Sequence, residues 1–294
     1  MFILMSFFLY IFNLIIIFFC NSFFLSWLYM EIIGILLICF MFYTSLNNYN
    51  KMNGLMLFFF LQIISGMGIF IGMYFCNFYI LMLFILLKLG SFPVHTWVIR
   101  IYSMFNIDEL FILSGMSKIQ LFFFILLINN NFYMFFFASF FSIFISSIYS
   151  LKFSNLMCLM GSFGIMSTGW LIVFFISKNY VILNLYLFLI IFLLYYFFKN
   201  NLYSLMYMLF FLIFMSGFPP SIFFFIKFYI FCKIFYFGFF LIFFLIFFNC
   251  IWYFVFYRLM NIFFFNFFFF FCNKNIIYIN LFIFFFMGSF LMSF

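Results

Sequence analysis

Four ionisable side chains lie inside long apolar runs of this sequence: Glu31, Lys88, Lys118 and Lys227. Lys88 follows about ten apolar residues, which a helix stacks to roughly 15 Å, half the thickness of a bilayer core. A charge at that depth costs about 2.5–3.5 kcal/mol on insertion scales, so four would cost on the order of 10 kcal/mol without partners. We therefore expect the four groups to face one another or a wet interior, and we identify them as candidate proton-relay residues.

The chemistry available to such a row is proton transfer. Removing a lysine from water favours its neutral form, so a buried lysine can exchange protons near neutral pH. Protonating one member of a row changes the proton affinity of its neighbours, so a charge change can move along it. We expect Glu31 and Lys88 to interact as a pair, Lys118 to be the central relay, and Lys227 to pass the proton onward. The structural alternative is that the charges only tie helices together, with lysines extending to the headgroups.

Glycine and proline interrupt two of these apolar runs. The stretch KLGSFP contains Gly90 and Pro93, and the stretch SGFPPSIFFFIK contains Gly217, Pro219 and Pro220. A proline removes one helical hydrogen bond, and in lipid the freed carbonyls must find water or protein partners. Interrupted helices of this kind mark ion sites in transporters that are built from inverted repeats. The two breaks fall in the fourth and ninth expected spans, which run in opposite directions, so we expect two inverted repeats, each with a discontinuous helix.

His95, the only histidine of the chain, follows Pro93 by two residues. Histidine titrates near pH 6.5, so His95 is a candidate to link Lys88 to the next relay group. The equal alternative is a polar anchor that donates to a carbonyl freed by the break.

For two acidic residues and two tryptophans, we expect structural rather than chemical roles. Asp108 and Glu109 precede the fifth expected span, where acidic residues are favoured at a helix start; contact with a partner is the alternative. Trp97 and Trp170 are expected to be packing or interfacial residues.

The composition requires lipid as the solvent of these elements. Of the 294 residues, 72% are hydrophobic, 71 are phenylalanine and only 5% are charged, against roughly 25% charged residues in a soluble domain. We expect an all-α polytopic membrane protein, with residues 1–294 forming a single membrane domain of about eleven transmembrane helices in one bundle. The expected spans are 2–20, 22–43, 54–74, 78–98, 109–128, 132–149, 155–177, 180–198, 203–232, 236–257 and 276–293. The segment 262–272 is short and is expected at the interface or packed on a neighbour.

The first residues of the chain, its composition and its basic residues predict where the protein resides and how it is oriented. Residues 1–20 lack the features of a cleavable signal or transit peptide and are expected to be the first span. The excess of Phe, Ile, Leu, Met and Asn suggests A- and T-rich codons, which favours synthesis inside a mitochondrion. Six basic residues are expected on the matrix face and only Lys178 and Lys233 on the other, which places the N-terminus in the matrix and the C-terminus in the intermembrane space. The six are Lys51, Arg100, Lys152, Lys199, Arg258 and Lys274.

The remaining composition argues against several classes of site. None of the seven cysteines forms a C-x-x-C arrangement, so neither a metal site nor a redox pair is predicted. The net charge of +8 comes from isolated basic residues, so no nucleic-acid partner is expected. One histidine cannot supply the paired axial ligands of a cytochrome b, and the cysteines form no iron–sulfur pattern.

In their order along the chain, these segments resemble the NADH dehydrogenase subunit 2 family of mitochondrial respiratory complex I, which belongs to the antiporter-like membrane subunits. SFFLSWLYMEIIG resembles the family's Trp-then-Glu segment, and LLKLGSFPVHTWV is similar to its K-L-G-x-A-P-F-H-x-W stretch. SGMSKIQLF stands where the family has a mid-helix lysine, and MSGFPPSIFFFIKFYIF resembles its G-L-P-P-x-x-G-F-x-x-K stretch. The segment SLKFSNLMCLMGSFGIMSTGWLIV resembles the family's segment that ends in Gly-Trp. The likeness covers most of the chain, and the eleven-helix count favours subunit 2.

This resemblance implies a core membrane subunit of the proton-pumping NADH:ubiquinone oxidoreductase of the inner mitochondrial membrane. Electron transfer in other subunits would drive protons through the row of Glu31, Lys88, Lys118 and Lys227. NADH, FMN, iron–sulfur clusters and ubiquinone would be bound by those other subunits, and none by this chain. Its partners would be the other membrane and accessory subunits and membrane lipids.

The sequence departs from the family at three places. Ser167 stands where a histidine often precedes Met-Gly-Trp, Ile99 and Arg100 replace a Pro-Glu pair, and the second glycine after the double proline is missing. Two alternatives remain beside the complex I interpretation. One is a stand-alone cation/proton antiporter of similar fold, and the other is a purely structural membrane subunit.

Overall fold

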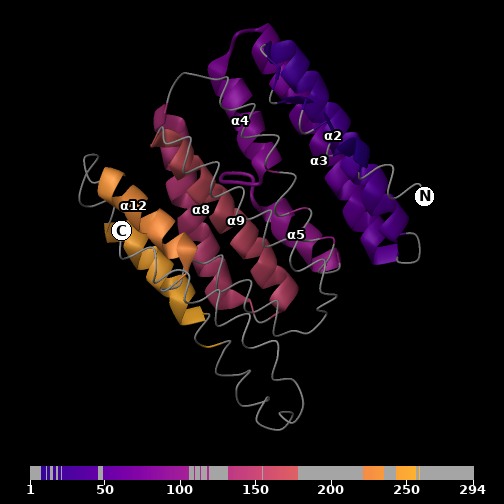
Figure 1. The fold of residues 1–294 in the computed structure, drawn as a ribbon. Helices are drawn as coiled ribbons and strands as arrows, with labels where there is room; N and C mark the ends of the chain where they lie inside the picture. The colour runs from indigo at the N-terminus through magenta and orange to yellow at the C-terminus, as the bar shows by residue number, and fades with distance from the viewer. Residues whose placement is uncertain are drawn as a thin grey trace. The chain divides into compact units, whose positions relative to one another are not determined.

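The computed structural model is mostly helical where it describes the chain, with no strand among those residues (Figure 1). It describes residues 8–10, 12–13, 16–17, 19–20, 22–45, 49–105, 109, 113, 118, 132–153, 155–177, 221–234, 243–255 and 258. The helices are α2 (Phe23–Ser45), α3 (Tyr49–Tyr74), α4 (Phe78–Leu89), α5 (Thr96–Met104), α8 (Phe132–Lys152), α9 (Leu156–Ile176) and α12 (Ile222–Ile234). A further apolar helix covers Phe243–Val255.

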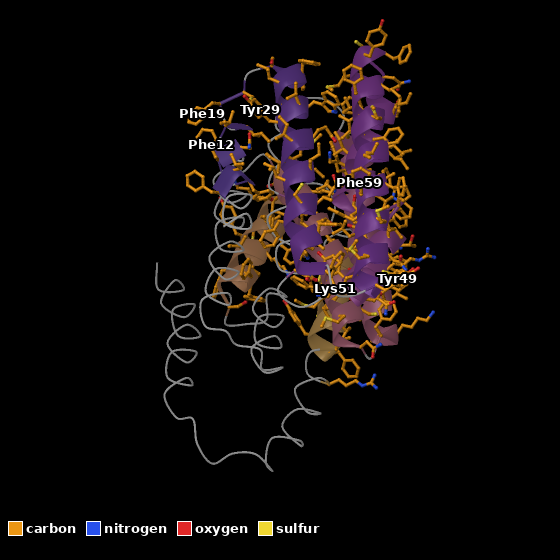
Figure 2. All side chains as sticks on the ribbon, turned by 90° about the vertical axis from the view of Figure 1, so that its right-hand side faces the viewer. Phe12, Phe19, Tyr29, Tyr49, Lys51 and Phe59 are labelled. Carbon is orange, nitrogen blue, oxygen red and sulfur yellow. The ribbon has the colours of Figure 1, made fainter. Side chains whose placement is uncertain are left out.

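Four of the described helices are long and apolar enough to cross a membrane, which makes this a membrane-embedded all-α protein. They cover Phe23–Phe42, Tyr49–Tyr74, Met134–Lys152 and Met157–Ile176. Large apolar side chains on the surface agree with a lipid surrounding: Phe12 and Phe19 are 54% and 78% exposed (Figure 2). These helices match four predicted spans, whereas 180–198 and 276–293 lie outside the described residues. The count of eleven spans stays a prediction.

Two predicted boundaries are wrong. α3 begins at Tyr49 rather than residue 54, since Lys51, expected in a loop, is buried in the first turn of α3 and paired with an acid. The fourth span was predicted to end at residue 98, but α5 continues to Met104. Arg100 therefore lies within α5 rather than at its end, and its side chain is exposed.

The chain divides into two compact units. The first comprises 1–146 and 153–176, and the second comprises 147–152 and 177–294. In the first unit α3 packs against α2, α4 and α5, and α5 packs against α9 (Figure 1). α8 approaches α9 closely, since a Cβ at Gly169 would meet the Ser142 hydroxyl and the side chain of Ile143. Of the predicted relay residues, Glu31, Lys88 and Lys118 lie in this first unit and Lys227 lies in the second.

α3 is the central element of that unit because it has a continuous buried face. Its buried positions repeat at three- and four-residue spacing, which places them along one side of the helix. They include Gly54, Phe58, Gln62, Gly66 and Ile69. Small residues at such positions let neighbouring membrane helices approach closely, and a buried glutamine among them marks a polar point on this face.

Local sequence signals set both ends of α4. The side chain of Asn77 accepts hydrogen bonds from the backbone N–H groups of Tyr79 and Ile80, which caps the helix start. At the other end Gly90 adopts a φ of 69°, in the left-handed region that favours glycine. The predicted break after Lys88 is therefore present, and it separates α4 from α5.

Candidate functional site

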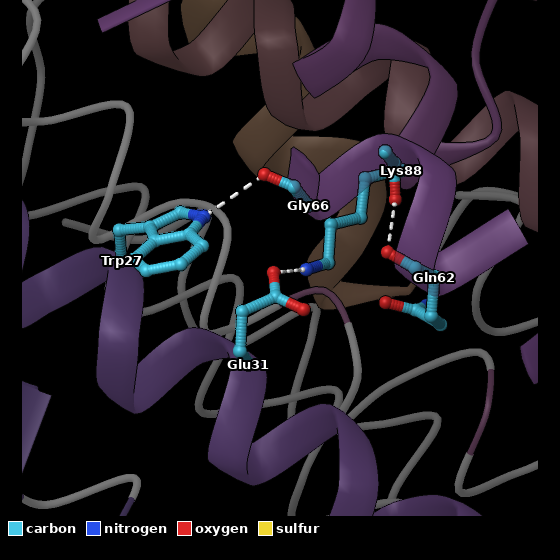
Figure 3. A network of polar contacts seen from close by, with 6 residues as sticks. Trp27, Glu31, Gln62, Gly66 and Lys88 are labelled. Atoms are coloured by element: carbon cyan, nitrogen blue, oxygen red, sulfur yellow. Dashed lines mark hydrogen bonds and ion pairs between the residues drawn. The ribbon is translucent and has the colours of Figure 1, made fainter. Parts of the chain in front are cut away.

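Glu31 and Lys88 form an ion pair between α2 and α4. The Lys88 amine donates to Glu31 Oε1 over 2.6 Å (Figure 3). The Lys88 side chain is 0% exposed and the Glu31 side chain is 24% exposed, so the acid is the more accessible partner. Lys88 is ten residues beyond the start of α4, as expected for a position deep in the apolar core. The predicted contact is present, and its role in proton transfer stays a prediction.

Gly66 of α3 makes room for the Glu31 carboxylate. A Cβ at this position would collide with Cδ and both carboxylate oxygens of Glu31. Beside it, the indole N–H of Trp27 donates to the Gly66 carbonyl over 3.0 Å, which joins α2 to α3 (Figure 3). The Trp-then-Glu segment therefore has a structural basis: Trp27 fixes the helix pair, and Glu31 occupies the space that Gly66 leaves.

Lys118 is buried and is held by α9. Its amine donates to the Gly164 carbonyl and to the Ser167 hydroxyl oxygen, each over 2.7 Å. The Ser167 hydroxyl in turn donates to the same Gly164 carbonyl over 2.9 Å. Ser167, the position of the missing family histidine, is thus the side-chain partner of the predicted central relay. Sequence reasoning noted the departure at this position but did not predict the contact.

The backbone carbonyls freed at the break between α4 and α5 accept hydrogen bonds from nearby residues. The Leu86 carbonyl accepts from the backbone N–H and the hydroxyl of Ser91, at 3.1 and 3.2 Å. The Leu87 carbonyl accepts from the Gly90 N–H at 3.1 Å and from the Trp97 indole N–H at 3.2 Å. Trp97, predicted as a packing or interfacial residue, therefore also donates across the break. These bonds hold the end of α4, and with it Lys88, in a defined position.

His95 makes the contact expected of an anchor. Its Nδ1 lies 3.1 Å from the Pro93 carbonyl oxygen, which requires the tautomer that carries its proton on Nδ1. Its ring stacks on that of Phe92 with 6.4 Å between the ring centroids. The Phe92 ring also contacts that of Phe141 of α8, with 5.0 Å between the centroids. The anchoring alternative thus has structural support, and the relay role of His95 stays a prediction.

Two of the buried lysines of this unit line one cavity. Lys88 and Lys118 both line it, together with Gln62 and, among its apolar walls, Phe58 and Trp97. It is large enough to hold an ordered water molecule. Chemically, the arrangement allows proton exchange between a carboxylate–amine pair and a second amine across a small cavity that can hold water.

A second buried ion pair was not predicted. The Lys51 amine donates to Glu109 Oε1 over 2.9 Å, and both side chains are about 5% exposed. Glu109 was expected to cap the fifth span and Lys51 to mark a loop on the matrix face. The structure instead brings the two together across 58 residues of sequence, in a contact within the chain that neither interpretation of Glu109 included.

Lys227, the fourth candidate relay residue, lies in the second unit. Lys227 lies in α12 and is 2% exposed. The break residues Gly217, Pro219 and Pro220 lie outside the described residues, as does Asp108. Lys233 is exposed in the last turn of α12 and lies 5.2 Å from the ring centroid of Tyr229.

Among the described residues, no group of three or more His, Cys, Asp or Glu side chains is placed to hold a metal ion. In comparisons with known proteins, no family model and no curated protein matches the chain. Any functional assignment must therefore be argued from the buried charges and their contacts.

Proposed function

We propose that this chain is a proton-translocating membrane subunit of an NADH:ubiquinone oxidoreductase of the complex I type. Protons pass through the row of Glu31, Lys88, Lys118 and Lys227, and electron transfer in partner subunits drives them. The chain carries no redox centre of its own. It resides in the inner mitochondrial membrane with its N-terminus in the matrix, as the distribution of basic residues predicts.

The observation that carries the proposal is the pairing of Glu31 with Lys88 beside a cavity that also reaches Lys118. A purely structural ion pair needs neither a second buried amine nor a cavity next to it. Ionisable groups inside membrane proteins face one another or water-filled cavities when they conduct protons. The order of the K-L-G…P-x-H-x-W and G-x-P-P…K segments adds the resemblance to subunit 2.

Purification from native membranes tests the assignment to a larger assembly. The chain should co-purify with an activity that oxidises NADH and reduces ubiquinone, since it has no electron carrier itself. In vesicles containing the chain alone, no exchange of Na⁺ or K⁺ for protons should occur. Cation-dependent exchange by the isolated chain would instead favour a stand-alone antiporter, and recovery without any NADH-oxidising partner would contradict the complex I assignment.

The structural alternative is tested by removing the charges. Neutral replacement of Glu31, Lys88, Lys118 and Lys227 together should abolish proton pumping by the assembly. If pumping stays normal in a correctly assembled quadruple variant, the chain is structural and the proposal is wrong.

A further inference from the structure

Gln62 has a buried polar side chain, and it is not one of the four residues of the proposed relay. It lies on the buried face of α3, one turn before Gly66, and is only 7% exposed (Figure 3). Its Oε1 atom is buried without a hydrogen-bond partner among the residues that the structure describes. A buried amide oxygen without a partner costs free energy, so its presence calls for a ligand that accounts for it.

The same side chain lines the cavity that Lys88 and Lys118 share. The Lys88 amine has one hydrogen bond, to Glu31, among the described residues. The Lys118 nitrogen has three positions for hydrogen bonds, and the Gly164 carbonyl and the Ser167 hydroxyl take two of them. The third position is a lone pair in the neutral amine and an N–H in the charged one. Both lysines thus retain a hydrogen-bonding position, and both line the cavity that the Gln62 side chain also lines.

We propose that Gln62 holds an ordered water molecule in this cavity, and that the water links the Glu31–Lys88 pair to Lys118. The water donates one hydrogen to Gln62 Oε1, accepts from the Lys88 amine and donates its other hydrogen to Lys118. This gives it three polar partners, the usual number for a buried water, in a cavity of sufficient size. Gln62 is a positioning residue, because its amide orients the water and does not itself take up the proton.

The transfer step rests on the proposed function and conserves every proton. The Lys88 ammonium gives a proton to the water oxygen, while the water gives one of its own to the lone pair of neutral Lys118. An N–H bond breaks at Lys88 and one forms at Lys118, and the water is regenerated. The products are a neutral Lys88 and a charged Lys118, so one positive charge has moved away from Glu31 toward α9.

Hydroxyl-radical footprinting detects the water without relying on activity. Phe58 is 3% exposed and lines the cavity, so X-ray radiolysis of the native assembly should label its ring through bound water. In Gln62→Met, which keeps the chain length but removes the oxygen, labelling of Phe58 should fall by up to about fivefold, because one lost hydrogen bond lowers the affinity for the water by about that factor. In Gln62→Glu, which retains an oxygen there, labelling should persist. Equal labelling in wild type and Gln62→Met would overturn the proposal.

Ser65→Ala is the matched control for these variants. Ser65 is equally buried on α3, but its hydroxyl donates to the backbone carbonyl of Gln62, and it is not among the cavity-lining residues. Phe58 labelling in Ser65→Ala should equal that of wild type. A fall as large as in Gln62→Met would show that general loosening of α3, and not loss of the water, causes the effect, and would overturn the proposal.

Proton pumping separates this inference from the proposed function. Pumping by Gln62→Met should fall about fivefold along with the water, and Gln62→Glu should restore most of it. If Lys118→Met loses pumping while Gln62→Met pumps normally, the water link is wrong and the proposed relay stands. If Lys118→Met pumps normally, the proposed function is wrong, and Phe58 labelling still decides whether Gln62 holds water.

Discussion

The Lys118 amine lies 2.7 Å from the Ser167 hydroxyl oxygen, which contacts the same Gly164 carbonyl as the amine does. A hydroxyl at this position accepts a hydrogen bond from the amine in either charge state. It has no titration of its own near neutral pH, unlike the histidine that the resembling family often has there. In the proposed relay, Ser167 therefore orients the Lys118 amine without taking up a proton itself.

Replacing Ser167 with alanine should slow proton pumping about fivefold, because the Lys118 amine loses one hydrogen bond. The rate of pumping relative to NADH oxidation in the purified assembly measures the effect. Ser162→Ala is the control, since Ser162 is equally buried on α9 and its hydroxyl donates only within its own helix, to the Leu159 carbonyl. Equal losses in both variants would indicate a packing defect and contradict a specific role for Ser167.

The Glu31–Lys88 pair should show strong energetic coupling. Glu31→Gln leaves the buried Lys88 amine without its carboxylate, and Lys88→Met leaves the carboxylate without its amine. The double variant should be less destabilised than the sum of the single variants, with a coupling free energy of about 0.5–3 kcal/mol. Thermal unfolding of the four proteins in detergent completes this cycle. Additive effects would mean that the two residues do not interact in the folded protein.

Enlarging Gly66 should displace the Glu31 carboxylate. Gly66→Ala should destabilise the fold by about 1–3 kcal/mol, because the added methyl overlaps the carboxylate in a closely packed interface. Gly34→Ala is a matched control on α2, where the new Cβ would lie 3.7 Å from its nearest neighbouring atom, Gln62 Oε1, which is an ordinary contact. A melting temperature for Gly66→Ala equal to that of Gly34→Ala would contradict the close approach of α2 and α3.

The buried Lys51–Glu109 pair should stabilise the first unit. Glu109→Gln leaves the Lys51 charge buried without a carboxylate, and breaking a buried pair in this way costs about 3–5 kcal/mol. The double variant Lys51→Met, Glu109→Gln should recover most of that loss, because no unpaired charge remains. Unfolding midpoints of the three proteins measure this. A double variant no more stable than Glu109→Gln would contradict the pairing.

The sequence predicts the Glu31–Lys88 contact because each charge stands alone in an apolar helix and needs a partner. It also predicts the break after Lys88, since Gly90 and Pro93 are strong local signals. Local signals of this kind act within a few residues of the chain, and the structure follows them closely at α4.

Contacts between distant residues are where sequence reasoning falls short. Lys51 and Glu109 both lie near predicted span ends, where a charge already has an explanation, so nothing required them to pair. The Trp97 bond to Leu87 and the Lys118 bond to Ser167 depend on how α4, α5 and α9 meet. Gln62 was overlooked because a neutral amide in an apolar helix carries a smaller penalty than a charge; its spacing of four residues before Gly66 was the available signal.

The most direct test of the proposed relay is proton pumping by the assembly containing Lys118→Met. Methionine preserves most of the side-chain volume but removes the amine, so the chain should assemble while pumping is lost. Lys152→Met is the control, since Lys152 is an exposed lysine in the last turn of α8. We predict that Lys118→Met translocates few or no protons per NADH oxidised, while Lys152→Met matches wild type. Normal pumping by a fully assembled Lys118→Met variant would contradict the account.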